Sequence, residues 1–300
     1  MDRLNAMGVF VAVAEEESFA AAARRLNSSP PAVTRTIAAL EAHLGIKLLT
    51  RTTRFVRATD AGLRYLESAR RILAEADEAD EAAAGVHASP RGQLAVTAPV
   101  LFGSMHVMPS IVEYLECYPE VSVNAVFLDR VVNLLEEGID VGIRIGALPN
   151  STMRAIPVGS VRRIVCASPQ YLSRHPGLHE PRDLAGQTII SASPVSPGKE
   201  WQMGEGKCQV SVKIQPRLTV TNNAAAIEAA LKGFGITRLM SYQVADHLAS
   251  GHLVRLLPEY EPAALPVHVI HLEGRQASAK VRSLVDVIVE RLRGNSAISA

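Results

Sequence analysis

Residues 18–57 read SFAAAARRLNSSPPAVTRTIAALEAHLGIKLLTRTTRFVR and contain seven basic side chains but one acid, Glu41. The 300-residue chain has a net charge of only +1, so the excess of about +6 in this segment is local. A basic island on a small helical unit is typical of a nucleic-acid-binding surface. The basic residues are Arg24, Arg25, Arg35, Lys47, Arg51, Arg54 and Arg57.

The spacing of apolar side chains predicts three short helices within the first 45 residues. Ser18 follows an acidic run at the end of the first helix and is a suitable N-cap for a second helix over residues 19–26. Residues 27–29 form a polar turn, and Pro30 then lies in the first turn of a third helix, where proline is tolerated. Gly45 is suited to end that helix.

Two short helices joined by a tight turn are the elements of a helix-turn-helix, whose second helix lies in the major groove of DNA. Thr34, Arg35 and Thr36 form the polar face of that helix here. The next segment, KLLTRTTRFVRAT, alternates charged and apolar residues like a two-stranded wing, with Arg51 and Arg54 expected at phosphates. A basic face alone would also fit an ordinary solvated helical domain, but the order of cap, turn, polar face and wing favours DNA binding.

A long helix is predicted from Asp60 to about residue 86, rich in alanine, glutamate, arginine and leucine. Its small apolar residues fall near coiled-coil spacing and suit close packing against a second copy of the chain. Packing of the helix on its own domain is the alternative. Residues 89–92, Ser-Pro-Arg-Gly, break the helical pattern and mark a hinge.

Composition indicates a soluble globular protein of two or three domains, with 48% apolar and 20% charged residues. No apolar run approaches the ~20 residues of a membrane span, and the apolar run at 7–14 lacks the features of a signal peptide. The cysteines, Cys117, Cys166 and Cys208, are widely separated, which favours a reducing, cytoplasmic location without disulfides or a zinc site.

No pattern in the chain predicts catalysis. GEGK at 204–207 lacks the rest of a phosphate-binding loop, and no Gly-x-Ser-x-Gly elbow occurs. His268 and His271 stand at odd spacing in one predicted strand, so they point to opposite faces and are poor co-ligands for a metal. We therefore expect a protein that is not an enzyme, with no metal and no cofactor.

The last two thirds of the chain alternate between strand and helix patterns, which indicates a parallel α/β sheet with covering helices. The expected strands are 93–98, 121–127, 140–146, 162–168, 187–191, 213–221, 235–240 and 265–272. The expected helices are 105–115, 131–137, 224–231, 242–248 and 279–293.

Residues 26–62, LNSSPPAVTRTIAALEAHLGIKLLTRTTRFVRATDAG, resemble the winged helix-turn-helix signature of LysR-type transcriptional regulators. The family pattern is Ser-x-Pro-Ala/Ser-Val-Ser-Arg, then Ile-x-x-Leu-Glu-x-x-Leu-Gly, then Leu-Phe-x-Arg, and the likeness covers the whole chain. Pro30 and Pro31 stand where many members have a polar residue and proline, and Thr50 replaces the usual Asn or Asp. The DNA contacts that the resemblance implies are Ser18, Ser29, Pro30, Pro31, Thr34, Arg35, Arg51, Thr53 and Arg54.

The same resemblance implies an α/β fold with a head (1–59), a linker helix for dimerisation (60–89) and an effector-binding domain (90–300). That domain is built like a periplasmic binding protein, with subdomain I at 92–161 and 268–300 and subdomain II at 162–267. The chain is expected to cross between them near 161–167 and 266–271. TAPVLFG at 97–103 is similar to the branch of the family with a TAPVxFG opening.

Ligands of such sheets bind where loops and helix N-termini meet at the carboxyl ends of the strands. Hydroxyls, helix N-termini and Arg144 at this edge predict a small polar or anionic effector. Taken singly, each residue is equally a turn or cap residue, and Arg144 could instead pair with Asp129. The candidates are Pro99, Val100, Phe102, Gly103, Ser104, Asp129, Arg144, Gly146, Ser191, Ser193, Thr221 and Asn222.

The sequence therefore predicts a cytoplasmic transcriptional regulator of LysR type that binds double-stranded operator DNA as a dimer of dimers (homotetramer). A small molecule bound between the subdomains would change the angle between the DNA-binding heads. RNA polymerase is a candidate partner, and no membrane is expected. The alternative is a transport-type small-molecule binding protein, for which the effector half alone would qualify but which the basic head disfavours.

Overall fold

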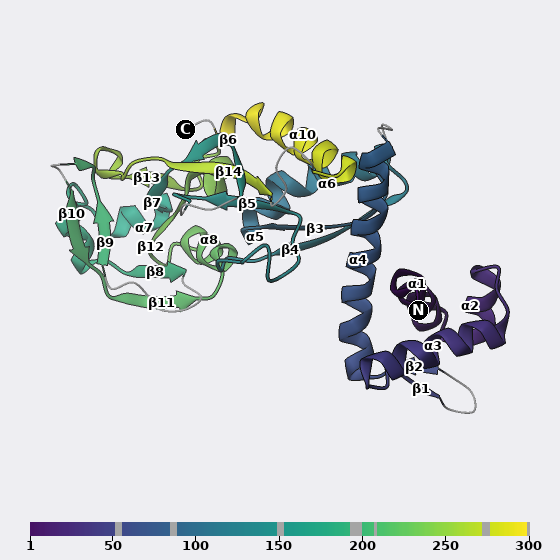
Figure 1. Cartoon of the computed structure of the whole chain (residues 1–300). Coiled ribbons are helices and arrows are strands. Elements are labelled where there is room, and N and C mark those ends of the chain that lie inside the picture. Colours follow the sequence, from purple (N-terminus) through teal and green to yellow (C-terminus); the bar gives the residue numbers. More distant parts are fainter. Residues whose placement is uncertain are drawn as a thin grey trace. The chain divides into compact units, whose positions relative to one another are not determined.

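The computed structural model describes residues 1–51, 56–84, 89–148, 153–192, 200–206, 209–271 and 277–298. The chain divides into two compact units, residues 1–88 and 89–300, whose elements are labelled in Figure 1.

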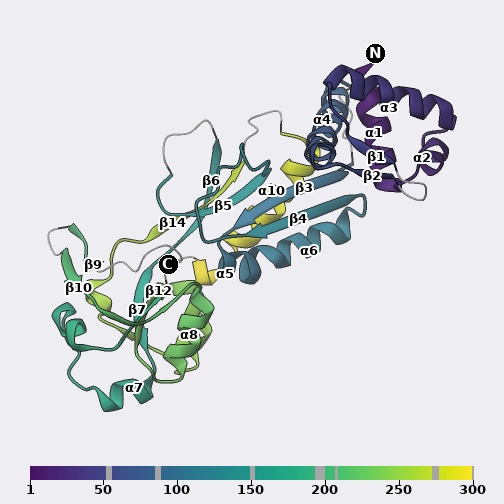
Figure 2. The ribbon, with the colours of Figure 1, turned by 90° about the horizontal axis from the view of Figure 1, so that it is seen from below.

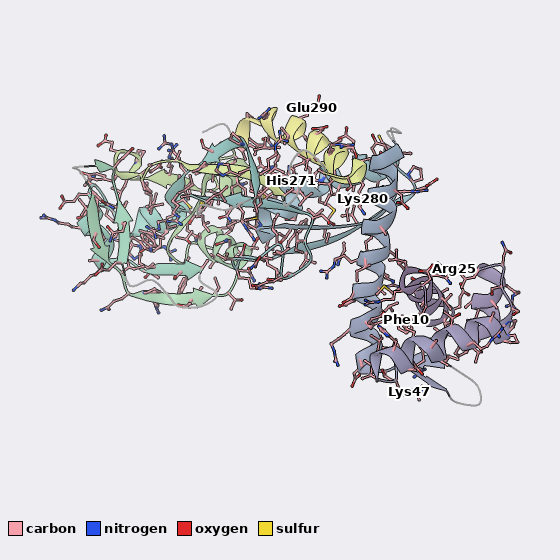
Figure 3. The ribbon with its side chains drawn as sticks, viewed as in Figure 1. Phe10, Arg25, Lys47, His271, Lys280 and Glu290 are labelled. Carbon is pink, nitrogen blue, oxygen red and sulfur yellow. The ribbon has the colours of Figure 1, made fainter. Side chains whose placement is uncertain are left out.

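The first unit is a small helical domain with a two-stranded wing. Its elements are α1 (Arg3–Glu16), α2 (Phe19–Arg25), α3 (Pro30–Leu44), β1 (Leu49–Arg51), β2 (Val56–Ala58) and α4 (Asp60–Ala84). Strands β1 and β2 pair antiparallel, which confirms the predicted wing. Phe10 of α1, labelled in Figure 3, is fully buried in the core. Its ring meets the ring of Tyr65 on α4 edge-on, with 5.4 Å between centroids.

The predicted helix boundaries of this unit are confirmed by their caps. The Ser18 hydroxyl accepts a hydrogen bond from the Ala21 amide at 3.2 Å, and the Ser29 hydroxyl accepts one from the Ala32 amide at 3.4 Å. Both bonds satisfy amides that have no partner within the helix. Gly45 ends α3 at a φ of 69°, in the left-handed region that glycine adopts without strain.

The start of the wing depends on Glu41, a buried residue of α3. Its carboxylate accepts hydrogen bonds from the Lys47 ammonium at 2.6 Å and from the backbone amides of Leu48 and Leu49 at 2.9 and 3.1 Å. Burial, the largest single effect, raises the pKa of this carboxyl. The three hydrogen bonds and the positive charge of Lys47 together outweigh burial and hold the pKa of Glu41 below its ordinary value.

The second unit contains two five-stranded sheets and a separate hairpin (Figure 2). The strands are β3 (Gly92–Ala98), β4 (Val121–Phe127), β5 (Val141–Ile145), β6 (Arg154–Val161), β7 (Arg163–Ala167), β8 (Ile189–Ala192), β9 (Glu200–Met203), β10 (Val210–Lys213), β11 (Pro216–Val220), β12 (Ile236–Met240), β13 (Val254–Leu256) and β14 (Leu265–His271). The α-helices are α5 (Val100–Phe102), α6 (Met108–Cys117), α7 (Pro169–Arg174), α8 (Asn223–Leu231), α9 (Ala245–Ala249) and α10 (Ala279–Arg293).

The first sheet, which we call sheet I, has the order β4-β3-β5-β14-β6, and the second, sheet II, has the order β11-β8-β12-β7-β13. Side chains of sheet I form one core with those of α6 and α10. Helix α8 packs on sheet II. The expected parallel arrangement holds within β3–β5 and within β8, β11 and β12. Strand β14 is antiparallel to β5 and β6, and β7 is antiparallel to β12 and β13, so both sheets are mixed.

Two of the predicted elements were wrong. Residues 131–137 form a single turn and no helix, because the Asn133 side chain caps the Leu135 amide and Gly138 ends the turn at a φ of 63°. The predicted strand 213–221 is divided between β10, which pairs with β9 in the hairpin, and β11, which lies at the edge of sheet II.

The chain crosses between the sheets at Arg162 and again within residues 257–264. The second crossing ends earlier than predicted, because Leu265 already pairs with Val161 in sheet I. Both crossings are held together. The backbone of Arg162 exchanges hydrogen bonds with Ser241, and its guanidinium donates to the Pro262 carbonyl at 3.5 Å.

We predict that Glu41→Gln lowers the free energy of unfolding at pH 7 by about 1–3 kcal/mol, because two buried amides and an ammonium lose a charged acceptor. The pKa of Glu41 is depressed on folding, so this stabilisation is present above the unfolded pKa and is lost as the pH falls through the folded value. The deficit of the variant in urea melts should therefore shrink below about pH 4. Lys47→Ala is the control and should cost less, because the Lys47 side chain is 78% exposed. A deficit independent of pH would contradict this role of the carboxylate.

Candidate functional site

The basic residues of the first unit fall into two groups. Arg25 forms ion pairs with Glu15 and Glu16 at 2.7 and 3.5 Å, and Lys47 pairs with Glu41. These two cations therefore stabilise the domain itself. Arg24, Arg35 and Arg57 are exposed and form no ion pair among the described residues, so their charge is available to an external anion.

Helix α3 presents its first turns to solvent. Ser29, Pro30 and Pro31 are exposed, Arg35 is exposed, and Thr34 is half-buried. The Ser18 and Ser29 hydroxyls accept bonds from helix amides as N-caps, as described above. Arg51 ends β1, where its backbone pairs with Val56. Thr53 and Arg54 lie outside the described residues.

A second candidate site is a cavity of about 470 Å³ between the two sheets of the second unit. Its position fits the expected ligand site, because the loops that follow β3, β4 and β11 reach it together. Its lining consists of Pro99, Leu128, Asp129, Arg130, Val131, Arg144, Ile145, Arg163, Ala192, Thr221, Asn222, Asn223, Arg238, Leu239, Met240, Tyr242 and Gln243. Sequence reasoning therefore named five of the described lining residues as candidates: Pro99, Asp129, Arg144, Thr221 and Asn222.

Polar atoms at the cavity already have partners within the protein. The Asp129 carboxylate accepts from the Val100 amide at 3.0 Å, and the Asn222 side chain caps α8 by accepting from the Ala225 amide at 2.8 Å. Arg144 donates to the Val132 carbonyl at 2.7 Å. Within the described residues it has no carboxylate within salt-bridge distance, so the alternative Arg144–Asp129 ion pair is not formed.

Two other candidates belong to the core of sheet I. Phe102 is fully buried and contacts the Tyr242 ring edge-on, at 5.1 Å between centroids. Gly103 lies so close to the Phe127 ring that a Cβ atom would come within 2.5 Å of it. The segment after β3 turns directly into helix, so both residues lie in the core and neither lines the cavity, although Phe102 packs behind the lining residue Tyr242.

The remaining candidates also do not line the cavity. Val100 is exposed, and the Ser104 hydroxyl donates to the Leu101 carbonyl at 3.1 Å. Gly146 follows β5 at a φ of 111°, and its amide donates to the Pro266 carbonyl. Ser191 is buried within β8, one residue before the cavity is reached. Ser193 lies outside the described residues.

Sequence reasoning missed Arg163, Arg238, Tyr242 and Gln243, which come from sheet II and its following turn. Arg238 stacks on Trp201 at 4.9 Å and donates to the Gln202 carbonyl at 3.2 Å. Burial lowers the pKa of Arg238 to about 10, and the nearby charge of Arg163 acts in the same direction. An arginine inside the apolar run GITRLM was the available signal, since a charge in a buried strand needs a reason.

Two further observations concern metal binding and membrane insertion. The described part of the chain holds no group of three His, Cys, Asp or Glu residues that could bind a metal ion. None of the helices in that part combines the length and apolar character that a membrane span requires.

Comparison with known proteins gives two family matches. Residues 4–63 match the bacterial regulatory helix-turn-helix protein, lysR family, and residues 87–293 match the LysR substrate binding domain. The chain is 33% identical to the HTH-type transcriptional repressor PA14_22550 of Pseudomonas aeruginosa, over 99% of this chain and 95% of that protein. It is also 33% identical to the HTH-type transcriptional regulator DmlR of Escherichia coli, over 95% and 93% of the two chains.

A solved structure extends the likeness to the fold of the whole chain. CrgA, a LysR-type transcriptional regulator from Neisseria meningitidis, is 30% identical with a TM-score of 0.62, covering 97% of this chain and 99% of that one. The full-length structure of AphB from Vibrio cholerae, at 24% identity and a TM-score of 0.61, has the same fold. The family matches, the winged head and the cavity between two α/β sheets together identify this chain as a DNA-binding transcriptional regulator of the LysR family, with an effector-binding domain.

Proposed function

We propose that α3 reads operator DNA in the major groove through Thr34 and Arg35, while basic residues of the wing contact phosphates. The observation that carries this proposal is the exposure of Arg35 on the polar face of α3, without an ion pair among the described residues. The start of α3 supports it, because Ser29, Pro30 and Pro31 are exposed next to Arg35 and leave this end of the helix open to a partner. Arg24 and Arg57 add exposed positive charge on neighbouring elements.

We further propose that two copies of the chain associate through α4, and that such dimers pair to form a homotetramer. The structure changes which residues suit this role. Leu66 packs against the core of its own head and Ala69 is buried, so this part of the stripe is not available to a second copy. Leu63 is 55% exposed and Leu73 is half-buried, so these leucines are the better candidates.

For the second unit, we propose that a small molecule binds in the cavity between the sheets and alters DNA binding. The two crossings at Arg162 and residues 257–264 allow the sheets to change their relative position around a ligand, as a hinge does. The chain would then act as a regulator with no catalytic step of its own. A transport-type binding protein, the alternative, would need neither α3 nor its exposed arginines.

We predict that Arg35→Ala weakens binding to the specific operator by about 1–3 kcal/mol, because a base contact is lost. Arg57→Ala should weaken binding to all sequences alike and lower the salt slope by about one unit, since a phosphate contact releases counterions. Fluorescence anisotropy across a salt series would measure both. Arg291→Ala removes an exposed arginine of α10 and is the matched control. Equal affinity of all three variants and the parent would contradict the assignment of α3.

We predict that Leu63→Asp and Leu73→Asp produce smaller species in light scattering, because each puts a charge into an apolar seam between two copies. Leu135→Asp is the matched control, since Leu135 is a 69% exposed leucine of the second unit. Thermal melts should show that the Leu63 variant remains folded. An unchanged assembly in both α4 variants would mean that another surface holds the copies together.

We predict that Ala192→Trp, which fills part of the cavity, leaves operator affinity near that of the parent but abolishes the response to small molecules. The readout is the DNase footprint with and without the low-molecular-weight fraction of an extract from the producing cell. Ala249→Trp, at the exposed end of α9 and outside the cavity lining, serves as the control. A variant that responds like the parent would place the effector elsewhere.

A further inference from the structure

The cavity between the sheets has an unbalanced set of charges. Four arginines line it, Arg130, Arg144, Arg163 and Arg238, and among the described lining residues the one acid is Asp129. One of the four is already neutralised, because Arg130 forms a two-bond pair with Glu137 at 2.7 Å for each bond. The other three have no carboxylate within 4.0 Å among the residues that the structure describes.

On the side of sheet II the positive charge is concentrated in Arg163 and Arg238. Strands β7 and β12 are paired, with Met240 opposite Arg163 and Arg238 opposite Val165, so the two arginines stand on adjacent strands. The guanidinium of Arg238 stacks on the Trp201 ring and donates to the Gln202 carbonyl, and these two contacts fix its position. Burial first, and then the nearby charge of Arg163, lower the pKa of Arg238. Two neighbouring guanidiniums without an acid provide donors for one bidentate anion.

On the side of sheet I, Arg144 is the corresponding group. It is half-buried at the end of β5 and held by the Val132 carbonyl at 2.7 Å. Burial lowers its pKa, against the opposing charge of Glu137, and the nearby Arg130 lowers it further. The Asp129 carboxylate on this side already accepts the Val100 amide. Arg144 therefore has donors left for a second anionic group.

We infer that the effector of this cavity is a dianion with two separate acid groups, one bound by Arg163 and Arg238 and the other by Arg144. This inference rests on the proposed effector function of the cavity and specifies its ligand. Arg144 and Arg238 are partly buried, and Arg163 is exposed beside Arg238. Partly buried cations without a counter-charge are unfavourable, and a ligand that supplies two carboxylates would remove that cost at Arg144 on one wall and at Arg238 on the other. A cavity of about 470 Å³ accommodates a molecule of this size.

A two-headed ligand also explains how binding could be transmitted to the fold. Each head would be held by a different sheet, so the ligand would link β5 of sheet I to β7 and β12 of sheet II. Both walls carry arginines, and an anion bound between them would balance their charge. A dianion favours a closer approach of the two sheets, which would rotate about the crossings. A monoanion neutralises the arginines of one sheet only and does not link the two sheets.

The test is isothermal titration calorimetry of the full chain with straight-chain α,ω-dicarboxylates from malonate to adipate. Each is compared with its monoamide and its diamide, which keep the length and shape while removing one or both charges. At least one dicarboxylate should bind, its monoamide should bind at least about tenfold more weakly, and its diamide should not bind detectably. Failure of every dicarboxylate to bind, or equal affinity for a dicarboxylate and its monoamide, overturns the inference.

Arginine variants identify the two sites separately. Arg163→Gln and Arg238→Gln should each reduce dicarboxylate affinity by about tenfold or more and reduce the preference over the monoamide, as should Arg144→Gln. Arg238→Lys keeps the charge and should recover part of the affinity. Arg217→Gln is the matched control, because Arg217 is an exposed arginine of sheet II that stacks on Phe234 outside the cavity lining. Melting temperatures would establish that each variant is folded. If the Arg238 variant is not, Arg163→Gln tests the same wall on its own.

The dianion inference and the proposed effector function of the cavity can fail independently of each other. A monoanion or a neutral molecule that changes the DNase footprint, and whose effect Ala192→Trp abolishes, would overturn the dianion while leaving the cavity as the effector site. A dicarboxylate that binds with unchanged affinity in the three arginine variants would show that the anion binds elsewhere.

Discussion

The two crossings between sheet I and sheet II constrain the whole effector-binding domain. Val161 ends a strand of one sheet and Arg163 begins a strand of the other, so a single residue joins them. Arg162 is fixed there by Ser241 and by Pro262 of the second crossing. Because the chain returns to sheet I antiparallel as β14, the C-terminal helix α10 completes the core that β3–β6 begin. The cavity lies between the sheets because of this connectivity.

The arginines of the cavity illustrate how a regulator retains residues that do not favour stability. Arg238 interrupts an apolar strand, and its guanidinium is held by a ring and one carbonyl in place of an acid. A hydrophobic residue of similar volume would remove the cost of taking a charge out of water. A charged residue at position 238 is therefore better explained by contact with a ligand in the cavity than by stability. The same reasoning distinguishes Arg238 from Arg255, whose guanidinium is paired with the Glu261 carboxylate on both oxygens.

The DNA-binding head uses its charges in the opposite way. Glu41 is the acid of the basic segment, and it is buried where it satisfies the amides that start the wing. Glu15 of α1 forms ion pairs with Arg25 of α2 and Arg70 of α4. These pairs link the three helices and remove two positive charges from the basic surface. Arg24, Arg35 and Arg57 form no ion pair among the described residues. The domain therefore separates the charges that hold its helices together from those left to its partner.

The sequence by itself determined the elements that depend on local chemistry. The caps at Ser18, Ser29 and Gly45, the wing, the long helix and most strands follow from spacing and side-chain type, and they were confirmed. It did not determine the turn at 131–137, where one capping asparagine and one glycine outweigh an apolar pattern. Nor could it show that Leu66 faces its own head, since helical spacing does not say which body an apolar stripe meets.

Only the tertiary structure decided which residues line the cavity. Pro99, Asp129, Arg144, Thr221 and Asn222 could be named because they follow strands or cap a helix, and such positions are local features of the sequence. Phe102 and Gly103 met the same criterion but pack in the core, because the chain turns into helix immediately after Pro99. Arg163 and Arg238 lie far apart in the sequence and meet only through strand pairing. Proximity of this kind is a property of the sheet order, which a single sequence does not encode locally.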